Sequence, residues 1–269
     1  MRKRIICVLL MLTLTLSAVG CGSSGTGYGV QTVQTLVAQE YSLAFRNDDP
    51  IYFYITATLE TLSAEGKVDE LAAKWFGDRI ITINKRAEAL SELATPAPQV
   101  FTIGLDVNSF PMAYNSNGSY WGFDVELAMA VCERLGWTLK MQPIEKENVY
   151  IELASGNIDC AWGGIALDEN EIADKKYTQY GPYVHNDIVV ATRNGSSVWN
   201  KLRLSGRNMA MCSTPEALAA LESDARLKKR LGQITRLAGG TTECFEYLYS
   251  GKCDTVLTDS TALYYFNCH

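Results

Sequence analysis

Runs of apolar and β-branched residues alternate with amphipathic segments along most of the chain, and this alternation predicts an α/β fold. The clearest unit is Val100–Ala128, which begins with the apolar, strand-like run Val100–Leu105. An amphipathic helix is expected from Phe123 onward. The loop between them carries Asp106, Phe110 and Tyr114. Open α/β sheets bind ligands at the carboxyl ends of their strands, so this loop is a candidate binding loop.

The same pattern extends over the rest of the chain. Strands are expected at 40–46, 100–105, 139–143, 158–165, 188–192, 209–212 and 255–258. Helices are expected at 51–62, 68–75, 80–93, 123–135, 149–154, 168–177, 244–249 and 262–266, and after the N-cap residues Ser213 and Thr214. Segment 30–37 is compatible with a short helix or a strand, and Thr95–Pro98 is a linker because X-Pro steps are extended.

An internal repeat suggests two similar lobes. Leu153–Asp159 and Leu248–Asp254 share the pattern L-x-S-G-x-x-D, and an apolar run follows each copy. A helix whose glycine cap leads into a buried strand explains both copies. The alternative is that the two segments are independent examples of a common helix-to-strand turn.

The first twenty residues predict a signal peptide. Arg2–Arg4 is basic, and Ile5–Ser17 is an apolar segment too short to span a bilayer comfortably. Ala18–Cys21 resembles the bacterial lipobox, in which the cysteine is lipidated, and Gly22–Gly27 would form a flexible tether. We therefore expect a lipid anchor (palmitate) on Cys21. The alternative is a plain secretory signal that leaves an ordinary thiol there.

Charge excludes several classes of partner. The chain has 269 residues, of which 47% are hydrophobic and 20% charged, as is typical of a globular protein. Its net charge of −6 becomes −9 when the three basic residues of the signal peptide are removed. An acidic chain argues against binding to nucleic acid and against adhesion to anionic lipid by charge alone.

The cysteines do not indicate a metal site. Six remain besides Cys7 and Cys21, and export permits disulfides between them. Cys132 and Cys160 stand in apolar runs, and all six are compatible with free, packed thiols. With two histidines and no CxxC motif, the chain is expected to hold neither a metal nor a cofactor.

Several motifs occur in the order and spacing of a known family. They are the strand and proline loop at 101–114, Gly122–Leu127, Ser155-Gly156 with Asp159 and Gly163-Gly164, Tyr180–Tyr183, and Asp254 with Asp259. With these, residues 101–265 resemble the periplasmic-type solute-binding proteins of polar amino-acid ABC importers (family 3). The resemblance implies an α/β, two-lobe periplasmic-binding-protein-like (type II) fold, in which helices flank a small, mostly parallel sheet in each lobe. It also implies a hinge between the lobes, a ligand in the cleft, and presentation of the closed form to a membrane permease.

The closing segment of that family stands at the front of this chain. Tyr41–Phe45 resembles its last strand, and Gly66 through Lys74–Gly77 resembles its C-terminal ending. We therefore expect a circular permutant, because permutation succeeds where termini are close and exposed. The alternatives are a segment that completes a neighbouring chain by domain swapping, and a rearranged fragment.

The permutation implies a division of the chain into a signal peptide and two lobes. The expected parts are the signal peptide (1–20), the tether and start of lobe 2 (21–39), lobe 1 (40–189) and lobe 2 (190–269). Within lobe 1, residues 40–85 are the permuted C-terminal segment, 86–99 a linker and 100–189 the original N-terminal segment.

The resemblance also implies which residues line the cleft. Asp259 matches the ammonium-binding aspartate of the family, with capping of the following helix as the alternative. Ser213 and Thr214 open a helix whose N–H groups would bind an anion, unless the two residues only cap it. Asp106 belongs to the binding loop, and the candidate aromatic walls are Phe110, Tyr114, Trp121 and Trp162.

The side of the cleft that grips the ligand carboxylate departs from the family pattern. The family reads G-x-T-x-T-x-x-R where this chain reads Gly164–Glu171, so Ala166 replaces the first threonine, Asp168 the second and Glu171 the arginine. A carboxylate does not bind a carboxylate, so an amine or cationic solute held by Asp259 and Glu171 would suit this site. Lys146 would supply a positive charge, or it is solvated between two glutamates.

The sequence thus predicts an extracytoplasmic solute-binding lipoprotein of an ABC importer, anchored to the bacterial cell membrane. It would act as a monomer, bind a small amino-acid-like or amine solute, and have no catalytic residues. The alternatives are an enzyme on the same fold, such as a dehydratase, and a ligand sensor that no longer serves transport. A glycosidase would need two carboxylates across the cleft.

Overall fold

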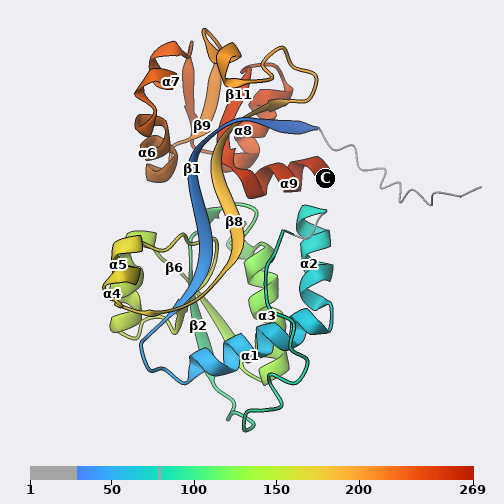
Figure 1. The fold of residues 1–269 in the computed structure, drawn as a ribbon, viewed down its shortest axis with the longest axis vertical. Coiled ribbons are helices and arrows are strands. Elements are labelled where there is room, and N and C mark those ends of the chain that lie inside the picture. Colours follow the sequence, from blue (N-terminus) through green and yellow to red (C-terminus); the bar gives the residue numbers. More distant parts are fainter. Residues whose placement is uncertain (1–28, 78–79) are drawn as a thin grey trace, which may run out of the picture.

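Two lobes joined by a pair of long strands make up the protein (Figure 1). The computed structural model describes residues 29–77 and 80–269. The expected signal peptide and the lipid site Cys21 lie outside the described residues. The connecting strands are β1 (Val30–Phe45) and β8 (Thr178–Arg193), and they contribute to the cores of both lobes.

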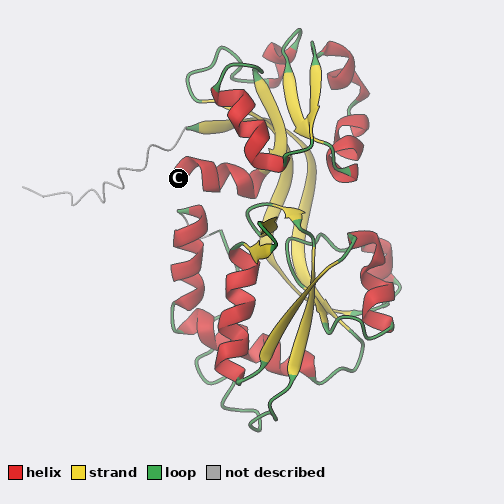
Figure 2. Cartoon of the chain, turned by 180° about the vertical axis from the view of Figure 1, so that it is seen from behind, coloured by secondary structure: helices red, strands yellow, loops and turns green. Residues whose placement is uncertain are grey.

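Lobe 1 is built on parallel strands with helices on both faces (Figure 2). Its strands are β2 (Val100–Leu105), β6 (Thr138–Pro143) and β7 (Cys160–Ala161). Its helices are α1 (Ile51–Ala64), α2 (Lys67–Phe76), α3 (Phe123–Leu135), η1 (Lys146–Asn148), α4 (Val149–Ala154) and α5 (Glu169–Ala173). A separate small sheet is formed by β3 (Asn108–Ser109), β4 (Ala113–Ser116) and β5 (Ser119–Trp121).

Lobe 2 repeats this plan. Its parallel strands are β9 (Met209–Cys212), β10 (Ile234–Leu237) and β11 (Thr255–Asp259). Its helices are η2 (Lys201–Leu204), α6 (Pro215–Ser223), α7 (Ala225–Arg230), α8 (Gly240–Tyr249) and α9 (Ser260–Cys268). Within the described residues one sheet runs through both lobes in the order β10-β9-β11-β8-β1-β7-β2-β6.

The β1–β8 pair forms the connection between the lobes. The strands are antiparallel from the Val30–Arg193 pair to the Phe45–Thr178 pair, with three shifts of register between. Residues 31–40 are half-buried or exposed, whereas 41–45 are buried in lobe 1. Such irregularities increase the local twist of the ladder where it passes from one lobe to the other.

Helix α3 shows how the sequence pattern produces a buried face. Phe123, Leu127, Val131 and Leu135 recur at intervals of four, and all are buried. They pack in the core of lobe 1 together with Phe101 and with residues of α1 and α2. The strand at Val100–Leu105 and this helix confirm two elements predicted from periodicity.

Several predicted elements differ from the structure. Residues 80–93 form no helix, because Ile81 bridges Val184 and the Thr82 N–H donates to Tyr183 O (2.7 Å), which holds the start of this segment extended. The helix expected at 168–177 ends at Ala173, and the strand β8 starts ten residues before the predicted one. The strand expected at 158–165 is restricted to Cys160–Ala161. Helix α7 and the 3₁₀ turn η2 were not predicted.

The two ends of the described chain lie side by side in lobe 2. The Val30 N–H donates to Asn267 Oδ1 (2.8 Å), and Asn267 Nδ2 donates to Val30 O (3.1 Å). The segment between α2 and β2 runs along lobe 1, where Ala97 O accepts the Trp137 Nε1–H (3.0 Å). Among residues 29–77 and 80–269, no helix combines the length and hydrophobicity needed to cross a bilayer.

Candidate ligand-binding cleft

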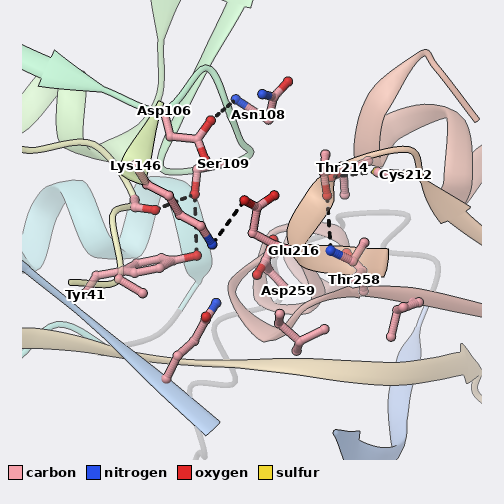
Figure 3. Close-up of a pocket in the computed structure, with 17 residues that line it drawn as sticks. Tyr41, Asp106, Asn108, Ser109, Lys146, Cys212, Thr214, Glu216, Thr258 and Asp259 are labelled. Atoms are coloured by element: carbon pink, nitrogen blue, oxygen red, sulfur yellow. Dashed lines mark hydrogen bonds and ion pairs between the residues drawn. The ribbon is translucent and has the colours of Figure 1, made fainter. Parts of the chain in front are cut away.

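A cavity of about 50 Å³ lies between the lobes and is lined by residues from both (Figure 3). Lobe 1 contributes Asp106, Ser109, Lys146, Gly164 and Ala166, and lobe 2 contributes Cys212, Thr214, Glu216, Thr258 and Asp259. A neighbouring open groove of about 630 Å³ is lined by Phe110, Tyr114 and Ser213. Asn108, Thr214 and Thr241 border both spaces, so the cavity lies beside the groove.

Parallel strand ends bring the charged residues of the cavity together. Asp106 follows β2, and Lys146 follows the end of the parallel strand β6. In lobe 2, Asp259 is the last residue of β11, and Glu216 is in the first turn of the helix that follows β9. The carboxyl ends of these strands face each other across the cleft, as expected for ligand sites in α/β sheets.

Lys146 and Glu216 form an ion pair across the cleft. Lys146 Nζ lies 3.1 Å from Glu216 Oε1, and the side chains are 27% and 25% exposed. The pair joins η1 of lobe 1 to α6 of lobe 2 (Figure 3). Lys146 is therefore engaged in a specific contact and is not simply solvated between its neighbouring glutamates.

Asp259 is held from one side by an amide. Asn186 Nδ2 donates to Asp259 Oδ1 (2.8 Å) and also lies 2.7 Å from the Tyr41 hydroxyl. Asn186 itself is fixed because its Oδ1 accepts the Thr261 N–H (3.2 Å). Burial raises the pKa of Asp259, while Asn186 and Lys146 act in the opposite direction. Asp259 occupies the N-cap position of α9, but its side chain forms no capping hydrogen bond to that helix.

Asp106 is the second carboxyl group with a perturbed pKa. Burial raises the pKa of Asp106 to about 6. The Asn108 N–H, which donates to Asp106 Oδ1 (2.8 Å), and Lys146 lower it, whereas Glu216 and Asp259 raise it. A positive charge in the cavity would favour the ionised form of this group.

Asp124 fixes the strand segment that forms one wall of the cavity. Its carboxylate accepts the Gly164 N–H (2.7 Å), the Trp162 Nε1–H (3.2 Å) and the Tyr183 hydroxyl (2.7 Å). Burial raises the pKa of Asp124 to about 7. The bond to Asp124 holds Trp162 in the core, where its side chain is fully buried. Trp162 was expected as a cleft wall and is instead part of the core.

Two further candidates do not reach the cavity, and one faces only the groove. Asp168 caps α5 by accepting the N–H groups of Asn170 and Glu171, and Glu171 pairs with Lys176 (3.4 Å) away from the cavity. The structure therefore does not bring Glu171 to the cavity. Trp121 is 49% exposed beside Ser116 and Asn117 on the surface, and it lines neither the cavity nor the groove. Ser213 lines the groove, and its N–H donates to Leu237 O (3.1 Å).

Phe110 and Tyr114 belong to an aromatic contact between the lobes. The Phe110 ring lies 5.1 Å from Tyr114, 4.8 Å from Tyr265 and 5.7 Å from Phe266. Tyr265 also lies 6.0 Å from Trp75 of lobe 1. These rings pack a loop of lobe 1 and helix α2 against α9, so Phe110 and Tyr114 line the groove and not the enclosed cavity.

Sequence reasoning missed four residues of the cavity and its surroundings. Glu216 follows a predicted helix start without a motif of its own, and Tyr41 begins a segment that was predicted only as a strand. Asn186 and Thr258 carry no motif that would single them out. Thr258 is 7% exposed, lines the cavity, and has a buried hydroxyl group without a hydrogen-bond partner.

The cysteines do not form a metal cluster. In the described part of the chain all six are free thiols, and no group of three or more His, Cys, Asp or Glu side chains has metal-binding geometry. Cys212 Sγ and Cys244 Sγ lie 3.6 Å apart at the lobe 2 side of the cavity. The buried thiols Cys132 and Cys160 agree with the expectation from their apolar surroundings.

Comparisons with known proteins give a consistent result. The probable amino-acid-binding protein YxeM of Bacillus subtilis is 26% identical over 164 residues, which cover 61% of this chain and 61% of that protein. A probable amino-acid ABC transporter-binding protein of Haemophilus influenzae is 26% identical over 160 residues, with 58% of each chain covered. The chain thus spans about three fifths of the length of these curated relatives.

Solved structures and a family description complete the comparison. A polar amino acid ABC uptake transporter substrate-binding protein from Streptococcus thermophilus is 26% identical, with 60% of this chain and 61% of that chain covered and a TM-score of 0.46. Residues 101–237, about half of the chain, match the family of bacterial extracellular solute-binding proteins, family 3. The chain therefore belongs to the bacterial extracellular solute-binding proteins of family 3.

Proposed function

We propose that the protein is the extracytoplasmic solute-binding component of an ABC importer and binds a small amino-acid-like or amine solute between its lobes. The observation that supports this most is Asp259, a half-buried carboxylate in a cavity lined from both lobes. The two curated relatives are named as amino-acid-binding and ABC transporter-binding proteins. The partner would be a membrane permease that recognises the closed form, and no turnover of the solute is expected.

A thermal-shift screen of amino acids and amines tests this proposal. A bound solute raises Tm because it stabilises only the folded state. Asp259→Asn should abolish the shift. Asp254→Asn is the control, because Asp254 immediately precedes the same strand and pairs with Arg207 (3.4 Å) away from the cavity. If no solute raises Tm, or if Asp259→Asn behaves like the control, the proposal fails.

The chain order is proposed to be a circular permutation, with lobe 1 at about 40–189 and lobe 2 at 190–269 plus the residues before 40. The adjacent ends, bonded through Val30 and Asn267, support this, as does the path of residues 80–99 along lobe 1. A chain reordered to run from 100 to 269, through a short linker, and then from 30 to 77 should fold and bind the same solute. A dimer in sedimentation, in place of a monomer, would favour domain swapping.

Lipid attachment at Cys21 is the last part of the proposal. Cys21→Ala should release the protein from the membrane fraction and remove label from radioactive palmitate, while Cys268→Ala should change neither. Retention of the Cys21→Ala protein at the membrane with its label intact would show that this cysteine carries no lipid.

A further inference from the structure

Given the proposed role in solute binding, we propose that the cleft takes a small organic cation that lacks a carboxylate, such as a primary amine or diamine, in preference to an amino acid. The inference rests on the charges of the cavity, on the hydrogen-bond groups left over there, and on the environment of helix α6.

The charge balance of the cavity is negative. Its lining includes three carboxyl groups, Asp106, Glu216 and Asp259, and a single basic side chain, Lys146. Lys146 is already paired with Glu216 (3.1 Å). The remaining two carboxyl groups have raised pKa values because burial and repulsion from Glu216 disfavour their charged forms. A cation relieves this repulsion, whereas an added carboxylate increases it.

Several of the hydrogen-bond donors near the cavity are already used. The Gly164 N–H donates to Asp124, and the Ser109 hydroxyl donates to Gly164 O (3.0 Å). The Nδ2 group of Asn186 contacts Tyr41 and Asp259. Together with the paired Lys146, these contacts occupy the single cation of the cavity and several of the donors that a ligand carboxylate would need when it leaves water.

Acceptors, in contrast, are available. Asp106 receives the N–H of Asn108, and Asp259 receives one Nδ2–H bond from Asn186, so each carboxylate retains lone pairs. The buried Thr258 hydroxyl has no partner in the described structure and lines the same cavity. An ammonium group has three donors and no acceptor, which matches this arrangement.

The start of helix α6 does not offer a carboxylate site either. Thr214 Oγ1 accepts the Ala217 N–H (3.3 Å), and Pro215 has no N–H group. Glu216 places its own negative charge in the first turn, where it already interacts with the positive end of the helix dipole. A ligand carboxylate at this end would lie beside that glutamate.

The size of the cavity fits a charged head group. A single water needs roughly 10–15 Å³ of such space, and the cavity provides about 50 Å³. The rest of a longer cation would extend into the groove, where Phe110 and Tyr114 offer aromatic faces for a second positive centre or an apolar chain.

The test compares matched ligands by calorimetry on the purified full chain. Each amino acid is paired with the amine that lacks only its carboxylate: ornithine with putrescine, lysine with cadaverine, arginine with agmatine, and histidine with histamine. At least one amine should bind tenfold or more tightly than its amino acid. Glu216→Gln should weaken amine binding and reduce this ratio at least tenfold, since it removes one carboxylate and frees Lys146. Glu222→Gln, an exposed position on the same helix, should leave the ratio unchanged.

Each outcome has a definite meaning. Tighter binding of the amino acid in every pair overturns the inference and leaves the proposed function intact. An unchanged ratio in Glu216→Gln overturns the assigned role of the carboxylate cluster. If neither member of any pair binds, the inference falls together with the proposed function.

Discussion

Replacing Asp124 by asparagine should remove a large pH dependence of stability. The pKa of Asp124 is raised to about 7 by burial, against an ordinary value near 3.9 in the unfolded chain. The folded state therefore binds the proton more tightly than the unfolded state. The contribution of Asp124 to the free energy of unfolding is therefore fully present below about pH 4, and it is lost as the pH rises through 7.

The magnitude follows from this shift. A difference of about 3 pKa units corresponds to about 4 kcal/mol between the two ends of the titration, of which about 3 kcal/mol falls between pH 5 and pH 8. Asparagine does not titrate, so Asp124→Asn should lack this part of the slope. It should also be less stable at pH 5. The Trp162 Nε1–H donates to Asp124 Oδ1 and the Gly164 N–H to Oδ2, so in either orientation the asparagine amide nitrogen faces an N–H group that it cannot accept.

Urea unfolding at a series of pH values, followed by tryptophan fluorescence, measures the effect. The control is Asp174→Asn, an exposed aspartate at the end of α5, which should keep the wild-type slope. Other carboxyl groups titrate in all three proteins and cancel in the comparison. If Asp124→Asn keeps the wild-type slope between pH 5 and pH 8, the raised pKa of Asp124 does not govern stability and the reasoning is refuted.

Three further substitutions test the packing. Gly122→Ala should lower the free energy of unfolding by about 3 kcal/mol or more, because the φ of Gly122 is +136° and the new Cβ would lie 2.2 Å from Met112 O. In the same thermal melts the control Gly118→Ala, where the space is open, should lower it by only about 1–2 kcal/mol. Phe110→Ala removes ring contacts between the lobes, so it should lower the free energy of unfolding by about 2 kcal/mol and increase the radius of gyration measured by X-ray scattering. An unchanged radius of gyration would contradict this prediction. Asn267→Ala should lower the free energy of unfolding by about 1–2 kcal/mol through loss of both bonds to Val30, and an unaltered midpoint in urea would oppose that role.

Elements with a full buried face could be predicted from the sequence, and elements shaped by tertiary contacts could not. Val100–Leu105 and Phe123–Leu135 carry complete apolar patterns and match the structure. The long strand β1 was missed as a single element, because residues 31–40 lie on a half-exposed ladder without a buried face. Residues 80–93 have helical composition, yet strand-like contacts with Tyr183 and Val184 hold the beginning of the segment extended.

The candidate site was predictable where a residue follows a strand. The structure places Asp106 and Asp259 at the cavity, together with Lys146, Gly164, Ala166 and Thr214. Glu171 was misplaced because its position depends on where a short helix begins, and Asp168 sets that start through its own side chain. Thr258 and Glu216 depend on the relative position of the lobes, which no local pattern encodes.

The place of β1 in the sheet has a consequence for how the protein is made. This strand is the first described element of the chain, yet it lies in the interior of the sheet, between β8 and β7. During synthesis, Phe45 emerges long before Cys160 and Thr178, the residues with which it pairs in the sheet. Val30 likewise emerges long before its partner Arg193. Pairings of such high contact order fold slowly and leave unpaired strand edges exposed to aggregation. The sheet can therefore be completed only after most of the chain has been synthesised.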